Sequence, residues 1–118
     1  MDKDSAGLYF GGKALADALL TKEDQIFLTS TLKDSERIQN HIASIANPLG
    51  LSLTGNPFVL PNGARLIFLN VNSKASGGFS GNAYVINCFD ESNFSYISRL
   101  VASWTMFKQH KATFISID

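Results

Sequence analysis

Cysteine is almost absent from this sequence of 118 residues. The single one, Cys88, cannot form an internal disulfide or a multi-cysteine metal site, which fits a reducing compartment such as the cytoplasm. Long apolar runs are absent too, and none approaches the roughly 20 residues that cross a bilayer. The opening Met1-Asp2-Lys3-Asp4 begins no apolar segment of a signal peptide. We therefore expect a soluble, cytoplasmic protein with no membrane partner, metal or cofactor.

An excess of charge of either sign is also missing, because ten basic residues balance ten acidic ones. Nucleic-acid-binding domains usually carry a basic patch that displaces counterions from phosphates, so this balance argues against nucleic acid as a partner. Between residues 38 and 89 only Arg65 and Lys74 are charged, and asparagines supply the polarity instead. Protein interfaces are depleted in charge at their centres. This stretch therefore either meets a protein partner or forms the buried sheet.

The N-terminal part has the pattern of helices, which we expect between about residues 13 and 47. Residues 1–11 are expected to be loosely ordered, whereas Lys13–Leu20 is rich in helix-forming residues. Thr21, with Asp24 three residues later, has the form of a capping box and would begin a second short helix through the apolar residues 26–28. Beyond it, apolar residues recur at spacings of four, three and four, which indicates one buried helix face: Ile38, Ile42, Ile45 and Leu49.

The remainder changes to strands and one further helix. Arg65–Val71 is apolar on both faces for most of its length, which predicts a central strand, and Ala83–Phe89 and Ala112–Ile117 predict two more. Between the last two strands, apolar residues line one side of a helix over about 91–109. We therefore predict one α+β domain, residues 1–118, with helices packed on a mixed sheet of four or so strands. Its expected core contains Ile38, Ile42, Ile45, Leu66, Phe68, Val85, Ile97, Leu100 and Trp104.

A glycine- and serine-rich loop over residues 72–82 is the most unusual segment. Its backbone could approach a phosphate, and Lys74 could supply the charge. However, the loop contains no Gly-Lys-Ser/Thr, and no helix begins directly after it to present oriented amides to an anion. A plain hairpin loop is the simpler interpretation. Phe79 must then bury its ring somewhere, either on its own domain or in a partner.

The residue types that support catalysis are scattered. His41, Cys88 and His110 follow no motif spacing, so the sequence predicts no catalytic residue and no metal ligand. Asp90 and Glu91 follow a strand, where α/β proteins often place sites, but they also suit the cap and first turn of the next helix.

Two helical features allow further interpretations. The helices on either side of Asp34 have the outline of a helix-turn-helix, but the surrounding acidic residues would repel phosphates. The last helix carries Trp104 and a serine-rich outer face, which suits close packing against another helix.

The sequence therefore predicts a small non-enzymatic accessory protein that acts by protein–protein contact, either with a foreign partner or with itself as a homodimer. The alternative is a small-ligand-binding domain or a minor enzyme, with a pocket near the loop 72–82 and Asp90. The candidate binding residues are Lys74, Phe79, Asp90 and Trp104.

Overall fold

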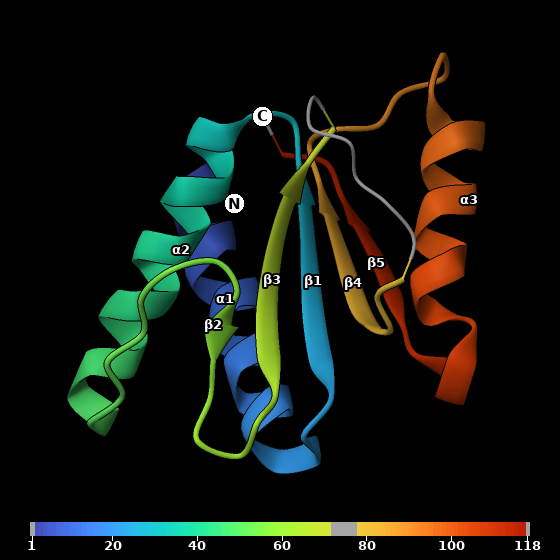
Figure 1. The fold of residues 1–118 in the computed structure, drawn as a ribbon. Coiled ribbons are helices and arrows are strands. Elements are labelled where there is room, and N and C mark those ends of the chain that lie inside the picture. Colours follow the sequence, from blue (N-terminus) through green and yellow to red (C-terminus); the bar gives the residue numbers. More distant parts are fainter. Residues whose placement is uncertain (1, 72–77, 118) are drawn as a thin grey trace.

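The computed structural model describes residues 2–71 and 78–117. Within these residues the chain forms three helices and five strands, and three of the strands follow one another between the second and third helices (Figure 1). The helices are α1 (Lys3–Thr21), α2 (Leu32–Ala46) and α3 (Phe94–Thr105), and short 3₁₀ turns cover Asn47–Leu49 and Phe107–Gln109. The strands are β1 (Asp24–Thr29), β2 (Phe58–Val59), β3 (Arg65–Asn70), β4 (Gly81–Ile86) and β5 (Ala112–Ile115).

The strands form one mixed sheet in the order β2-β3-β1-β4-β5. The central strand β1 runs parallel to both neighbours, with Ile26 opposite Ile67 of β3 and Ala83 of β4. β5 adds to β4 in parallel, and the two-residue β2 lies antiparallel at the other border. The expectation of helices packed on a mixed sheet is therefore confirmed.

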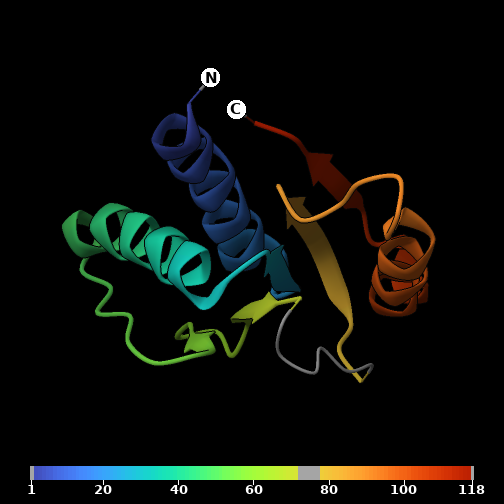
Figure 2. The ribbon, with the colours of Figure 1, turned by 90° about the horizontal axis from the view of Figure 1, so that it is seen from above.

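The helices cover both faces of the sheet (Figure 2). α1 and α2 pack side by side on one face, over a core that includes Phe27, Phe68 and Tyr84. α3 covers the other face, where Trp104 lies fully buried with Ile26 and neighbouring aliphatic side chains. Of the nine expected core residues, seven are buried, whereas Ile45 and Leu100 are partly buried and pack against these two clusters.

Two glycines set the distance between α1 and α2. A Cβ at Gly7 would lie 2.8 Å from the ring of His41, and one at Gly11 would lie 2.8 Å from the side chain of Ile42. Both glycines are buried on the face of α1 that meets α2. The same glycines explain why the start of α1 is not apparent from the sequence, since glycine is a poor helix former. The segment expected to be loosely ordered is helical from Lys3 onward.

The expected short helix through residues 26–28 is instead the central strand β1. All of its residues from Gln25 to Thr29 are buried, because helices cover both faces of the sheet. A continuous apolar run of this length is compatible with a buried strand or a buried helix, and periodicity alone does not separate the two.

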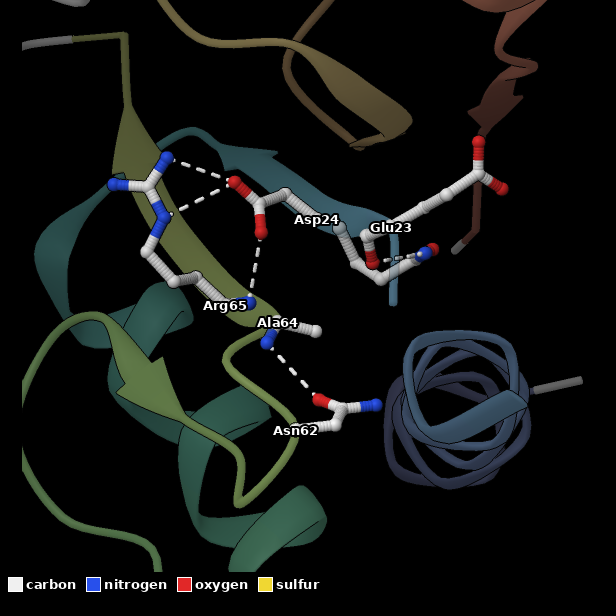
Figure 3. A network of polar contacts seen from close by, with 6 residues as sticks. Glu23, Asp24, Asn62, Ala64 and Arg65 are labelled. Atoms are coloured by element: carbon white, nitrogen blue, oxygen red, sulfur yellow. Dashed lines mark hydrogen bonds and ion pairs between the residues drawn. The ribbon is translucent and has the colours of Figure 1, made fainter. Parts of the chain in front are cut away.

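The amino ends of the strands are held together by charged and amide side chains (Figure 3). Asp24 accepts hydrogen bonds from the backbone N–H of Arg65 at 2.8 Å and from its guanidinium at 2.7 and 3.0 Å. Asn62 donates to the last turn of α1 and accepts from the backbone N–H of Ala64 at 2.9 Å. Glu23 pairs with His110 at 3.0 Å. This amino edge joins α1, β1, β3 and the segment before β5.

Candidate functional site

A small cavity lies at the opposite edge of the sheet, where the parallel strands end. In open α/β sheets, ligands bind outside the carboxyl ends of the strands, at the point where successive connections leave on opposite faces. Here that point lies between β1, which is followed by α2, and β4, which is followed by α3 on the other face. The cavity has a volume of about 40 Å³ and mostly apolar walls. Its lining, which we call the carboxyl-edge pocket, consists of Lys3, Ala6, Gly7, Thr29, Asp34, Arg37, Ile38, Ile86, Asn87 and Ile117.

Two buried hydroxyl groups close the β1 side of the carboxyl-edge pocket. The Oγ1 of Thr29, at the end of β1, lies 2.7 Å from the Oγ of Ser35 in the first turn of α2. Ser35 also contacts the carbonyl oxygen of Leu69 at 3.4 Å, and Thr29 donates to the carbonyl of Thr31 at 3.1 Å. Because these hydroxyls are already paired within the protein, they connect β1, β3 and α2 and leave little capacity for a ligand.

Asn87 closes the β4 side. Its backbone has a positive φ of 51°, which asparagine tolerates better than most residues. Its side-chain oxygen accepts a hydrogen bond from the N–H of Ile117 at 2.6 Å, and its own N–H donates to Ile115 at 2.9 Å. Asn87 therefore fixes the end of β5 against β4 and uses its acceptor within the fold.

The start of α1 brings negative charge to the same edge. Asp2 caps the helix, and its Oδ1 accepts a hydrogen bond from the N–H of Ser5 at 2.7 Å. Hydrogen bonds from Ser5 hold the pKa of Asp2 below its ordinary value, so this carboxylate stays ionised at neutral pH. Asp4, one turn along, lies 3.2 Å from the ring of His41 on α2. A carboxylate thus already occupies the positive end of the helix dipole.

The described residues contain no group of three His, Cys, Asp or Glu side chains able to hold a metal ion. Cys88 is buried against the carbonyl of Leu28, and burial raises the pKa of its thiol to about 11. A thiol with this pKa is protonated at neutral pH and is a poor nucleophile. The chemistry available at this edge of the sheet is therefore hydrogen bonding rather than nucleophilic attack.

The structure does not bring the four sequence-predicted binding residues together in one pocket. Trp104 is fully buried and Phe79 is half-buried against the same core cluster, so the Phe79 ring folds back on its own domain. Asp90 lies in the turn before α3, where it accepts hydrogen bonds from Ser92 and Asn93 that hold its pKa below the ordinary value. Lys74 lies outside the described residues. Binding by these four residues stays a prediction.

The carboxyl-edge pocket was not predicted from the sequence, because its lining residues are spread along the chain from Lys3 to Ile117 and form no motif. The one available signal was topological, namely that the ends of parallel strands meet at one edge. That signal required β1 to be recognised as a strand.

None of the helices among residues 2–71 and 78–117 has the length and apolar composition needed to span a bilayer.

Comparisons with known proteins give consistent matches. A family model described as terminase large subunit, T4likevirus-type, N-terminal, matches residues 6–117. The probable terminase ATPase subunit of Haemophilus phage HP1 is 42% identical over 80 residues, which cover 67% of this chain and 13% of that protein. The terminase ATPase subunit of Escherichia phage P2 is 33% identical over 112 residues, which cover 94% of this chain and 19% of that protein.

The crystal structure of the HK97 bacteriophage large terminase superposes with a TM-score of 0.74 at 14% identity, over 97% of this chain and 27% of that one. At this identity the likeness shows the fold. The chain thus spans about a quarter or less of the length of the proteins that it matches.

These matches overturn two expectations from the sequence. The generic adaptor acting by protein–protein contact is wrong, as is its small-ligand alternative, because the chain matches terminase ATPase subunits over most of its length. The argument against nucleic acid is wrong as well, since a terminase family is one in which nucleic acid is the expected partner. The net charge misled because it was counted over a segment that is at most a fifth of the length of these phage relatives.

Proposed function

The chain belongs to the family of T4-like-virus-type terminase large subunits and corresponds to their N-terminal region. From this premise we propose that it acts in the packaging of phage DNA. The observation that carries the proposal is the extent of the match, which takes in every helix and strand except the first residues of α1. The identity to the phage P2 subunit over 94% of the chain supports the same assignment.

Within this role, we propose that the chain is one α+β domain that supplies part of the framework of an ATPase subunit. The relatives that are named ATPase subunits are about five times as long as this chain, so DNA contact and ATP hydrolysis by the whole subunit involve more chain than these 118 residues. We expect the chain to have no catalytic activity by itself. Its sequence contains no Gly-x-x-x-x-Gly-Lys-Ser/Thr, the loop that binds phosphates in many ATPases. We also expect it in the cytoplasm of the host cell.

A segment exchange tests the proposed role. In the phage P2 subunit, the segment that matches this chain over 112 residues is replaced by the corresponding residues of this chain. The chimeric subunit should be soluble, should unfold cooperatively, and should keep the affinity of the parent subunit for double-stranded DNA at matched salt. A control exchange with an unrelated α+β domain of similar size should lose these properties. A chimera that behaves no better than this control contradicts the proposed function.

A further inference from the structure

The relatives are named ATPase subunits, and open α/β sheets bind their ligands at the carboxyl edge, so a nucleoside triphosphate is the ligand to consider there. We infer that the carboxyl-edge pocket of this chain is closed to nucleoside triphosphates, since its own side chains take the places that a triphosphate and its Mg²⁺ need. The inference rests on the proposed function only for the identity of the ligand. The evidence that the pocket is closed comes from contacts at three places: the start of α1, the carboxyl ends of the strands, and the interface between α1 and α2.

The start of α1 does not fit a phosphate. A helix N-terminus binds phosphate through free backbone N–H groups, commonly after a glycine-rich loop and beside a lysine. Here the Asp2 carboxylate accepts the N–H of Ser5 at 2.7 Å, and the Asp2 carbonyl accepts the N–H of Ala6 at 3.0 Å. To bind these amides, a phosphate would have to displace the Asp2 carboxylate, which is also negatively charged, from the N–H of Ser5.

The balance of charge around the pocket also disfavours a triphosphate. Lys3 and Arg37 line the pocket and are its cations, whereas Asp34 lines it from the first turn of α2. Asp2 and Asp4 add two more carboxylates at the start of α1. Within the lining itself two basic groups face one acidic group, and the Asp2 and Asp4 carboxylates lie outside it on the same end of α1, where they weaken the attraction that Lys3 and Arg37 exert on a triphosphate.

The strand ends do not fit a Mg²⁺ ion. In phosphate-loop ATPases the metal is held by a Ser or Thr of the loop and by an aspartate of the Walker B motif. The last residues of the four parallel strands here are Thr29, Asn70, Ile86 and Ile115, none of which is acidic. The Thr29 hydroxyl is committed to Ser35, and the side-chain oxygen of the following Asn87 is committed to the N–H of Ile117. The oxygen donors that Thr29 and Asn87 supply at the strand ends are thus neutral and already paired.

The cavity is too small, and the helices beside it cannot separate cheaply. Its volume of about 40 Å³ holds a water molecule or two, whereas small-molecule sites measure roughly 300–1,000 Å³. Gly7 and Gly11 place α1 directly against His41 and Ile42 of α2. Opening the pocket along this interface would expose part of the core that α1, α2 and the sheet share.

The first experiment measures nucleotide binding to the full 118-residue chain. Mg·ATP is titrated by calorimetry up to millimolar concentration, and thermal unfolding is followed with and without it. We expect no binding heat and a Tm that is unchanged within about 1 °C, because only a ligand that binds the folded state raises Tm. Circular dichroism confirms that the sample is folded, and the phage P2 subunit serves as the positive control. Saturable binding of Mg·ATP to the folded chain overturns the inference and leaves the proposed function standing.

A second experiment tests the part played by Asp2. Inorganic phosphate is titrated into the parent chain and into Asp2→Ala while the amide NMR signals of Ser5 and Ala6 are observed. The parent should show no saturable change, whereas the variant, in which the Ser5 amide is free, should show changes at these two signals. An unchanged variant would mean that Asp2 is not what excludes phosphate, and that step of the inference would fail. A saturable response of the parent would overturn the inference as a whole.

Discussion

The two edges of the sheet are held together by different chemistry. At the amino edge the contacts are made by ionisable side chains: Asp24 lies 2.7 Å from Arg65, and Glu23 lies 3.0 Å from the ring of His110. At the carboxyl edge, neutral groups connect the elements by hydrogen bonds, which join Thr29 to Ser35 and Asn87 to Ile117. Among the described residues, no buried side-chain nitrogen or oxygen lacks a hydrogen-bond partner. The buried polar side chains at the edge where α/β proteins usually bind ligands are therefore as fully paired as those at the amino edge.

The largest expected effect lies at the amino edge, at Gly81. A Cβ on this residue would overlap the backbone carbonyl oxygen of Asp24 on the neighbouring strand. Gly81→Ala should therefore cost about 3 kcal/mol or more, because the two strands would have to move apart. Urea denaturation measures the loss. Gly12→Ala is the matched control, since its Cβ would meet Ile45 at an ordinary 3.7 Å and should leave stability equal or slightly higher. Equal midpoints for Gly81→Ala and the parent would contradict the close approach of β1 and β4.

The second effect is the loss of the Asp24 carboxylate. Asp24→Ala leaves the backbone N–H of Arg65 without its acceptor at 2.8 Å and also removes two guanidinium contacts. We expect a cost of about 2 kcal/mol, mainly from the partly buried backbone donor, because the Arg65 side chain is 43% exposed and its ion pair is weakened by solvent. Glu36→Ala, on the exposed face of α2, is the control and should change stability little. If the two variants unfold at the same denaturant concentration, the amino edge is not held by this network.

At the carboxyl edge, a change of similar size should cost less. Thr29→Val keeps the shape of the side chain and removes the hydroxyl that lies 2.7 Å from Ser35. Ser35 retains its contact with the carbonyl of Leu69, so we expect a loss of only about 1 kcal/mol. Thermal unfolding beside Asp24→Ala makes the comparison directly. A loss larger than that of Asp24→Ala would reverse the proposed ranking of the two edges.

The smallest effect depends on pH and concerns Asp90, just beyond the end of β4. Hydrogen bonds from Ser92 and Asn93 lower its folded-state pKa below the ordinary 3.8, so the ionised form stabilises the folded state. This contribution is complete above the unfolded-state pKa and disappears as the pH falls through the lower folded-state pKa. The stability difference between the parent and Asp90→Asn should therefore grow from about pH 2 to pH 5 and stay constant above that. A difference that is independent of pH over this range would exclude a role for the charge.

Much of the fold could be predicted from the sequence where a periodic pattern was long enough. The apolar residues at helical spacing from Ile38 onward correctly predicted α2, and the apolar run after Arg65 correctly predicted β3. β1 was missed because Ile26, Phe27 and Leu28 are too few to show a period, and the preceding Thr21 suggested a helix cap. The side chain of Thr21 instead bonds within the end of α1, to the carbonyl of Asp17 and the N–H of Glu23.

The carboxyl-edge pocket and the family could not be predicted in the same way. The pocket depends on which strands are neighbours, and β1 pairs with residues about 40 and 60 positions later in the chain. Asp90 was correctly placed beyond a strand, but its hydrogen bonds run to its own turn rather than to a ligand. The similarity to the terminase subunits is distributed over residues 6–117, with no short motif that would identify it.

The central position of β1 also has a consequence for the order in which the protein folds. Of the five strands, β1 is synthesised first, yet both of its partners, β3 and β4, come later than the helix that follows it. Until then, Ile26, Phe27 and Leu28 have no sheet to join, although each is fully buried in the finished fold. Pairings between distant residues slow folding, and exposed apolar strands promote aggregation while they wait. The nascent chain thus passes through a stage in which its most deeply buried strand has to be shielded, and α1 and α2, which flank β1 in sequence, can cover it before β3 and β4 are made.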